Sequence, residues 1–314
     1  MNTHKDRRQA ALSGISDEPA RDIISRYLDG DISAEMALMY RLQATRSLEP
    51  ILAELAVAID ESAAAGLHQQ SASLTTLSAL AAVNRSGCDR VAGMLRSGVD
   101  TDEPAANVDE GIAFCKRLFD WSVGECAEAS VALYSLGNPA ILDAATVEIV
   151  HLMQRWQLLG RGRRLLEIGC GIGRFQKALA GNVLAVTGID VSANMIRTAC
   201  TRCAGCNNVT LSECSGRDLA LFASASFDFV YAVDSFPYLF QSGMTLVEKH
   251  FEEVARVLRP GGDFLILEFS YRRDLDSDRF DVRRLASTGF DVLIDGTQPF
   301  NLWDGAAFHL RARI

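Results

Sequence analysis

The apolar positions of this chain follow two different periods, and the change falls near its middle. From Ile15 to Gly98 the sequence is rich in Ala, Leu and Met at helical spacing, which predicts a packed set of amphipathic helices. Turn residues predict the helix ends: Asp29-Gly30-Asp31 precedes a helix opened by Ser33, Gly66 follows another, and Ser86-Gly87 precedes a short one. Four or five helices fit, so the first third of the chain is predicted to be all-helical.

A polar segment separates this region from the rest of the chain. The residues Gly98–Asn107, GVDTDEPAAN, contain Pro104 and form the best candidate for a linker. We therefore predict a helical N-terminal domain of residues 1–107 and a second domain of residues 108–314. Two further helical patterns, GIAFCKRLFDWSV and AILDAATVEIVHLMQRWQLL, open the second domain.

After these helices, strand and helix patterns alternate regularly. Such alternation is typical of an α/β fold with a doubly wound, mostly parallel, Rossmann-like sheet. The last two segments, FDVLID and AFHLRARI, would bring the sheet to seven strands. The five earlier strand candidates are Arg164–Ile168, Val183–Ile189, Val209–Glu213, Phe227–Val233 and Asp263–Glu268.

The charge balance and the cysteines limit the possible partners. The chain has 314 residues, of which 40 are acidic and 31 basic, so its net charge of −9 offers no broad surface to nucleic acid or to an anionic membrane. It contains no apolar run that resembles a signal sequence or reaches the roughly 20 residues of a membrane span. We expect a cytoplasmic protein whose eight cysteines are reduced thiols.

A glycine-rich turn lies between the first predicted strand and the next helix. Gly169, Gly171 and Gly173 follow LLEI and precede RFQKALAG, so the backbone there is able to approach a ligand closely. The spacing is G-x-G-x-G, and Arg174 stands where a dinucleotide site needs its last glycine, so no pyrophosphate is expected. Asp190 ends the next strand, where its carboxylate can accept hydrogen bonds from the hydroxyls of a ribose.

The order of the motifs EIGCGIG, GIDVSANM, SGRDL, FDFVYAVDSFPYL and RVLRPGG resembles that of the class I S-adenosylmethionine-dependent methyltransferases. The resemblance covers roughly residues 108–314. It implies a Rossmann-like sheet of seven strands with the last one antiparallel, S-adenosylmethionine as cofactor and S-adenosylhomocysteine as product. The first hundred residues match no family with a known function.

The resemblance also implies roles for individual residues in cofactor binding. The glycine turn would surround the methionine part of the cofactor, with Cys170 packed beneath it. Other residues would orient the turn (Glu167), hold the ribose (Asp190), flank the adenine (Val191 and Met195), meet the adenine edge (Arg217 and Asp218) and offer a carbonyl to its amino group (Val233).

By the same resemblance, the segment Asp234–Leu239 would face the methyl group. Its titratable side chains, Asp234 and Tyr238, are the candidate catalytic residues. Tyr134, in the segment ALYSLGN, is predicted to act as a lid over the cofactor. Methyl transfer from a sulfonium is an in-line displacement, so positioning of the nucleophile supplies much of the acceleration.

The acceptor is predicted to be a small metabolite that reacts through O, N or C, and the helical region would cover its pocket near the carboxyl edge of the sheet or form a homodimer contact. Two alternatives remain open. One is a non-catalytic sensor that binds S-adenosylmethionine. The other is a thiol or metal enzyme built on Cys200, Cys203 and Cys206, although a helix would spread these thiols over about 9 Å of rise. No metal site is predicted.

Overall fold

The computed structural model describes residues 12, 14–15, 17–97 and 105–313, and the chain forms two compact units. The first is drawn from residues 1–100, 125–142 and 301–304, and the second from residues 101–124, 143–300 and 305–314. Most of the predicted linker, residues 98–104, lies outside the described residues. A domain boundary near Val108 therefore stays a prediction.

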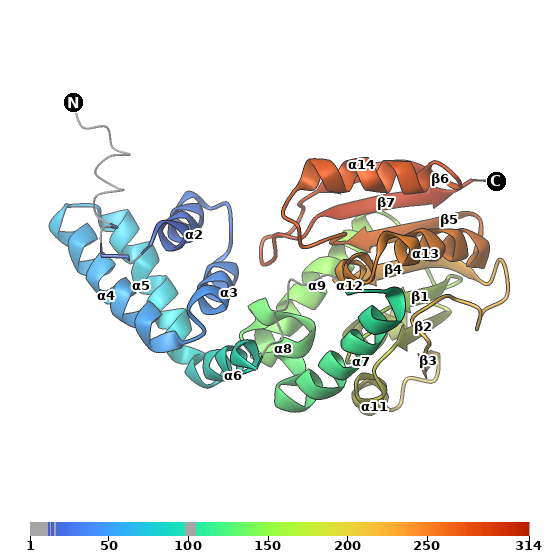
Figure 1. Cartoon of the computed structure of the whole chain (residues 1–314), viewed down its shortest axis with the longest axis horizontal. Helices are drawn as coiled ribbons and strands as arrows, with labels where there is room; N and C mark the ends of the chain where they lie inside the picture. The colour runs from blue at the N-terminus through green and yellow to red at the C-terminus, as the bar shows by residue number, and fades with distance from the viewer. Residues whose placement is uncertain (1–11, 13, 16, 98–104, 314) are drawn as a thin grey trace. The chain divides into compact units, whose positions relative to one another are not determined.

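The first unit is helical, as predicted (Figure 1). Its helices begin where the sequence provides caps: Asp17 accepts a hydrogen bond from the backbone N–H of Ala20 at 2.7 Å, and Ser33 accepts one from Met36 at 3.0 Å. Among the described residues, five helices precede residue 98. The elements are α2 (Glu18–Asp29), α3 (Ala34–Thr45), α4 (Leu48–Ala64), α5 (His68–Val83), α6 (Arg85–Arg96), α8 (Ala127–Val131) and η1 (Leu133–Ser135).

The prediction that Ser86-Gly87 precedes a helix is wrong, because α6 begins at Arg85 and includes both residues. A Cβ atom on Gly87 would lie 1.9 Å from the carbonyl oxygen of Leu136, in the turn after η1. The glycine therefore allows a close backbone approach and does not end a helix. That approach depends on a segment about fifty residues away in sequence, so no local pattern could indicate it.

The second unit contains a seven-stranded sheet with the order β3-β2-β1-β4-β5-β7-β6, in which β7 runs opposite to the other six strands. The predicted fold class is confirmed. The strands are β1 (Arg164–Ile168), β2 (Ala185–Asp190), β3 (Val209–Glu213), β4 (Phe227–Val233), β5 (Leu258–Leu267), β6 (Phe290–Thr297) and β7 (Ala307–Ala312).

Helices connect these strands and cover both faces of the sheet. On one face α13 packs Val247, Phe251 and Val254 against Phe264 and other buried residues of the central strands. The helices are α7 (Val108–Glu125), α9 (Pro139–Arg155), α10 (Arg174–Leu179), α11 (Ala193–Arg202), α12 (Phe236–Gln241), α13 (Met244–Val257) and α14 (Leu275–Ala286), with a 3-10 turn η2 (Ala180–Asn182).

Strand β5 begins five residues earlier than predicted. Leu258 pairs with Phe227 and Asp263 with Phe229, so the register shifts and the intervening Arg-Pro-Gly-Gly segment bulges from the ladder. Helix α13 ends at Val257, just before the Pro-Gly sequence, and the buried Leu258 pairs on the other side of a bulge. The strand therefore continues through residues that read as a turn.

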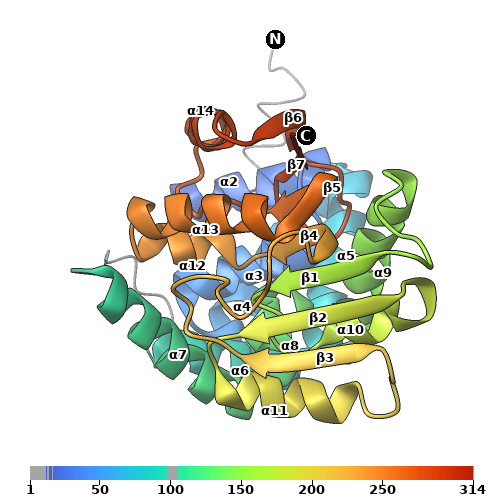
Figure 2. The ribbon, with the colours of Figure 1, turned by 90° about the vertical axis from the view of Figure 1, so that its right-hand side faces the viewer.

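The carboxyl ends of the parallel strands lie at one edge of the sheet. Figure 2 shows the arrowheads of β1, β2 and β3 at this edge, with α7 running across it. Ligands of open α/β sheets bind at this edge, and the glycine turn follows β1 there. The carboxyl edge is therefore the place to look for a functional site.

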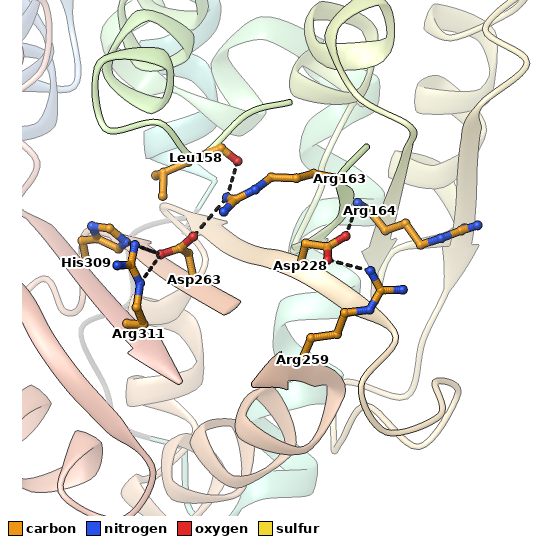
Figure 3. Close-up of polar contacts among 8 residues, drawn as sticks. All are labelled: Leu158, Arg163, Arg164, Asp228, Arg259, Asp263, His309 and Arg311. Atoms are coloured by element: carbon orange, nitrogen blue, oxygen red, sulfur yellow. Dashed lines mark hydrogen bonds and ion pairs between the residues drawn. The ribbon is translucent and has the colours of Figure 1, made fainter. Parts of the chain in front are cut away.

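The opposite, amino edge is held by a buried charge network (Figure 3). The carboxylate of Asp263 accepts hydrogen bonds from His309 at 2.9 Å, from Arg311 at 2.8 Å and from Arg163 at 3.0 Å. Asp263 is fully buried on β5, and its partners come from β7 and from the segment that leads into β1. This network fastens the antiparallel strand to the parallel part of the sheet.

Candidate cofactor and acceptor site

The glycine turn after β1 is packed tightly between two other segments. Gly169 and Gly173 have φ values of +74° and +73°, in the left-handed region that favours glycine. A Cβ on Gly169 would lie 2.5 Å from the Cβ of Ser235, after β4, and one on Gly173 would lie 2.9 Å from the Cβ of Ala199 in α11. The turn therefore needs glycine for both conformation and space.

Four backbone N–H groups of this turn are already used within the protein. Those of Gly169 and Cys170 donate to the carbonyl of Ile189 at 2.9 Å, and that of Gly173 donates to Cys170 at 3.0 Å. The N–H of Gly171 donates to the carboxylate of Asp190 at 2.9 Å. A phosphate site needs such donors to point at the ligand, so this turn is not built for a pyrophosphate.

Asp190 lies where predicted, at the carboxyl end of β2 beside the turn. Its two oxygens accept hydrogen bonds from the N–H groups of Gly171 and Ser192, both at 2.9 Å, and each oxygen keeps further lone pairs for a ligand hydroxyl. Burial raises the pKa of Asp190 to about 6, although these two N–H groups oppose the shift. The carboxylate is thus fixed in orientation and is charged at neutral pH.

Glu167 lies beneath the turn, on β1, and is almost fully buried. Gln176, on α10, donates a hydrogen bond to it at 2.6 Å, and Tyr231 is its register partner on β4. Burial raises the pKa of Glu167 to about 8, and the hydrogen bond from Gln176 and the charge of Arg174 only partly oppose this. Glu167 therefore carries a proton at neutral pH and supports the turn as a neutral group.

The predicted adenine residues gather beside β2 and β3. Met195 is buried near the start of α11, and Val191 packs so closely on Gly216 that a Cβ there would lie 2.7 Å from its Cγ1. Asp218 helps to line a cavity of about 500 Å³ together with five neighbours. The other lining residues are Glu213, Cys214, Ser215, Ala220 and Leu221.

Unlike the adjacent Asp218, Arg217 does not line this cavity. Its side chain pairs with Asp109 of α7 on the surface, and its backbone N–H donates to the hydroxyl of Ser215 at 3.2 Å. This N–H is the group that was predicted to meet the adenine edge. The roles of Arg217 and Asp218 toward adenine stay predictions.

Helix α7 lies across the carboxyl edge and contacts the segments around β2 and β3. The carboxylate of Asp120 accepts hydrogen bonds from the hydroxyl of Ser192 at 2.7 Å and from the N–H of Asn194 at 3.0 Å. Lys116 forms an ion pair with Glu213 at the end of β3. These contacts join α7 to the start of α11, directly beside Asp190.

The predicted acceptor residues lie after β4. Asp234 directly follows Val233, the last residue of the strand, and the hydroxyl of Tyr271 donates a hydrogen bond to it at 2.7 Å. The ring of Tyr238 meets the rings of Phe119 and Tyr271 edge to face, with centroid distances of 4.9 and 5.8 Å. Asp234 and Tyr238 thus belong to one group of contacts, while their catalytic roles stay predictions.

Tyr134 belongs to the first unit, whereas the other predicted site residues belong to the second. Its buried ring stacks on Trp303 with centroids 6.1 Å apart. Its role as a lid stays a prediction.

The cysteines show different surroundings. Cys170 is buried in the turn, and burial raises the pKa of its thiol well above the usual value. Cys200 is exposed, whereas Cys203 is buried and its thiol contacts the carbonyl of Gly173 at 3.5 Å. Within the part of the chain that the structure describes, no three His, Cys, Asp or Glu side chains are grouped to hold a metal ion.

Sequence reasoning missed Asp120, Gln176 and Tyr271, which contact predicted site residues. Tyr271 is an aromatic residue four positions after β5, a signal that could have placed it at the carboxyl edge. Asp120 and Gln176 lie in helical patterns and carry no local signal.

Among the described helices, none has the length and apolar character needed to cross a bilayer.

Comparison with known proteins supports the resemblance. Residues 166–266 match the family model described as a methyltransferase domain. An S-adenosyl-L-methionine-dependent Diels-Alderase of Talaromyces variabilis is 27% identical over 45% of this chain and 48% of its own length. A demethylmenaquinone methyltransferase of Tropheryma whipplei is 34% identical over 36% of this chain and 44% of its own length. The chain thus spans about half the length of these relatives.

A solved structure shows the same fold. The phosphoethanolamine N-methyltransferase 1 of Haemonchus contortus, crystallised with phosphoethanolamine and S-adenosylhomocysteine, is 17% identical, and the match covers 66% of this chain and 50% of that one with a TM-score of 0.55. Residues 166–266 thus match a methyltransferase domain, and the second unit, with its strand order and glycine turn, has the Rossmann-like fold of a known methyltransferase.

Proposed function

We propose that this chain binds S-adenosylmethionine at the carboxyl edge of its sheet and transfers the methyl group to a small metabolite. The observation that carries this proposal is the pairing of the glycine turn with Asp190. The N–H groups described above are committed within the protein, and a buried, oriented carboxylate stands beside the turn. Such a site suits a cationic cofactor with a ribose and no phosphate.

The residues present fit this cofactor. The turn would lie under the methionine part, the carboxylate of Asp190 would accept hydrogen bonds from the ribose hydroxyls, and Val191 and Met195 would flank the adenine. The bound cofactor supplies an activated methyl group. The protein contributes orientation, since it holds the acceptor on the line of the breaking bond. The acceptor reacts through O, N or C, and the chain's net charge of −9 favours a metabolite over nucleic acid.

Calorimetry with S-adenosylmethionine, S-adenosylhomocysteine and NAD tests the cofactor. We expect the first two to bind and NAD not to bind. Asp190→Asn removes a charged acceptor and is expected to lower the affinity for S-adenosylhomocysteine by about tenfold to a hundredfold, since a charge-assisted hydrogen bond contributes about 1.5–3 kcal/mol. Gly169→Ala, whose Cβ would meet Ser235, is expected to lower this affinity as well.

Gly181→Ala is the matched control, because no atom lies within 4 Å of the added Cβ. It is expected to leave the affinity unchanged. Binding of NAD but of neither adenosylmethionine compound would end the proposal. So would an Asp190→Asn variant that is folded and binds as tightly as the wild-type protein.

One observation favours a second function. The relative from Talaromyces variabilis is named a Diels-Alderase, so a related fold is associated with a reaction other than methyl transfer. In that case, as in a sensor, this chain would bind S-adenosylmethionine without consuming it. Incubation with labelled S-adenosylmethionine and fractionated small metabolites distinguishes the functions: label in a product, with an equal amount of S-adenosylhomocysteine, supports the methyltransferase.

The wider setting of the protein stays a prediction. A cytoplasmic location, the absence of a nucleic-acid partner and a homodimer through the helical region all follow from the sequence arguments alone.

A further inference from the structure

Two carboxylates follow neighbouring strands at the acceptor end of the site. Val233 and Leu267 are register partners on β4 and β5, and Asp234 and Glu268 come directly after them. The N–H of Asp234 donates to the carbonyl of Leu267 at 2.8 Å, which holds the two strand ends together. The acceptor end therefore carries an acidic side chain after each of two adjacent strands, and that of Glu268 accepts a hydrogen bond from the N–H of Ala306 at 3.0 Å.

Both acidic residues have an unusual backbone conformation. Asp234 has φ +56° and Glu268 has φ +67°, in the left-handed region that residues other than glycine seldom adopt. Such conformations cluster at functional sites, where the surrounding structure imposes them. Here they turn the chain sharply as it leaves each strand.

Aromatic rings adjoin the first of these carboxylates. Asp234 accepts a hydrogen bond from Tyr271 at 2.7 Å, and the ring of Tyr271 meets that of Tyr238 edge to face. Phe119 of α7 adds a third ring, 4.9 Å from that of Tyr238. The three rings are partly exposed. A carboxylate beside partly exposed aromatic rings is a favourable environment for an organic cation.

This group is fastened to the cofactor turn. Ser235, next to Asp234, donates a hydrogen bond to the carbonyl of Ile168 at 2.7 Å, and its Cβ is the atom that a Cβ on Gly169 would meet. Asp234 is therefore one residue from the closest contact with the turn. A group held by Asp234 would lie close to the turn that we propose for the methionine end of the cofactor.

The nearby Arg272 is engaged elsewhere. It pairs with Asp278 at 2.7 Å and with Asp281 at 2.9 Å, and its guanidinium lies 5.0 Å from the centroid of the Phe240 ring. Its positive charge is balanced by these two carboxylates of α14. Arg272 therefore pairs with α14 and not with the acidic side chains after β4 and β5.

We propose that the methyl acceptor is a primary or secondary amine, bound with its nitrogen at Asp234 and its carbon skeleton against Phe119 and Tyr238. This inference rests on the proposed function. The bound ammonium first gives one proton to the carboxylate of Asp234 or to solvent, which frees the nitrogen lone pair. In the reaction, this lone pair forms a bond to the methyl carbon while the carbon–sulfur pair goes to sulfur. Sulfur becomes neutral and nitrogen becomes a substituted ammonium, which later gives its extra proton to solvent.

The charge of the site favours nitrogen over oxygen. Transfer to an amine moves positive charge from sulfur to nitrogen, and a carboxylate at the nitrogen stabilises that charge as it develops. Transfer to a phenol requires the phenolate, and a carboxylate beside it opposes its formation. Asp234 thus binds the acceptor, and Tyr271 is a positioning residue that holds the carboxylate.

Two matched probes test this inference without knowledge of the natural acceptor. 4-Fluorobenzylamine is a cation at neutral pH, and 4-fluorobenzyl alcohol has nearly the same shape without the charge. Fluorine NMR line broadening measures the affinity of each, with and without S-adenosylhomocysteine. We expect the amine to bind about tenfold more tightly, as a cation does beside a carboxylate and aromatic faces.

Three variants test whether the stronger binding of the amine depends on Asp234. In Asp234→Asn the two probes should bind equally, and in Phe119→Leu both probes should bind about threefold more weakly with the preference for the amine retained, because this ring contacts the shared carbon skeleton. Asp291→Asn removes an equal charge from a surface ion pair with Arg313 and should preserve the preference. Equal binding of the two probes to the wild-type protein, or a full preference in Asp234→Asn, overturns the inference.

The same samples separate this inference from the proposed function. If S-adenosylhomocysteine does not bind while the Asp234-dependent preference persists, the cofactor assignment fails and the amine subsite stands. If S-adenosylhomocysteine binds and the preference is absent, the cofactor site stands and the acceptor is not an amine. In Tyr271→Phe we expect a smaller preference at unchanged S-adenosylhomocysteine affinity; an unchanged preference removes Tyr271 from the proposal.

Discussion

Glu167 shows how a single buried acid couples this site to pH. Its pKa is raised to about 8 by burial, whereas in the unfolded chain it would titrate near its ordinary value of 4.5. A raised folded-state pKa means that the stabilising contribution is fully present below about pH 4.5 and is lost as the pH rises through about 8. Between these values the folded protein holds a proton that the unfolded chain has released.

Glu167→Gln removes this proton linkage while keeping an oxygen that can accept the hydrogen bond from Gln176. We expect the wild-type protein to lose stability relative to the variant as the pH rises from 5 to 8, by about 1.4 kcal/mol per pH unit. Urea unfolding of both proteins at several pH values measures the difference. Glu248→Gln, at a half-exposed ion pair with Arg284, should show no such trend. A constant difference between wild type and Glu167→Gln would contradict the assignment.

At the residue scale, the sequence predicts those site residues whose motif partners lie close by in the sequence. The glycine turn and Asp190 are predicted because strand, turn and helix follow one another within about 25 residues. Tyr271 and Asp120 were missed because their partners, Asp234 and Ser192, are 37 and 72 residues away. Only the fold brings such pairs together.

At the element scale, α7 depends on a few polar contacts to hold its place over the carboxyl edge. Asp120→Ala removes the acceptor for Ser192 and for the N–H of Asn194 at the start of α11. We expect a loss of about 1–3 kcal/mol, because these donors would be left unsatisfied. Hydrogen exchange should become faster in α7 and at the start of α11, and affinity for S-adenosylhomocysteine should fall.

Asp109→Ala is the control on the same helix. Its ion pair with Arg217 is exposed on both sides and should contribute little to stability, because water screens it. Exchange in α11 should be unaffected in this variant. If both variants behave alike, the buried hydrogen bonds of Asp120 are not what holds α7.

The sequence predicts elements better than it predicts their ends. Strands β1, β3 and β4 have their predicted bounds, because apolar runs there are closed by clear turn residues. The starts of β5 and α6 were misplaced, since in both cases glycine permits a tertiary contact and does not end an element. Gly and Pro indicate a special backbone conformation, but its purpose depends on the neighbouring segments.

At the scale of the whole molecule, the sheet of the second unit has its candidate site at one edge and a stabilising charge network at the opposite edge. The candidate cofactor and acceptor residues lie at the carboxyl ends of the parallel strands, whereas the network around Asp263 lies at the amino edge (Figure 3). Asp263 lies on β5 at the amino edge, and β5 ends four residues later at Leu267, directly before Glu268 of the proposed methyl-acceptor site. One strand thus connects both edges, so the cofactor affinity of a variant at Asp263 tests whether a change at one edge affects the other.

The pH dependence of Asp263 is opposite to that of Glu167. Burial would raise the pKa of Asp263, but hydrogen bonds from His309 and Arg311 outweigh it and lower the pKa to about 2. Its stabilising contribution is therefore present above its unfolded value of about 3.8 and is lost as the pH falls toward 2. Asp263→Asn should lower the free energy of unfolding by about 1.5–3 kcal/mol at pH 7, because the buried side chain loses its charge-assisted hydrogen bonds with Arg163 and Arg311.

Urea unfolding at pH 7, 5 and 3.5 measures this loss. We expect the same difference at pH 7 and 5 and a smaller one at pH 3.5, because there Asp263 of the unfolded wild-type chain binds a proton while that of the folded protein remains charged. Asp228→Asn, at the same edge but partly exposed, should cost about 1 kcal/mol, the contribution of an ordinary hydrogen bond. Since neither residue contacts the cofactor turn, both folded variants should bind S-adenosylhomocysteine with wild-type affinity. A weaker affinity in Asp263→Asn alone would show that strain at the amino edge passes along β5 to the acceptor end.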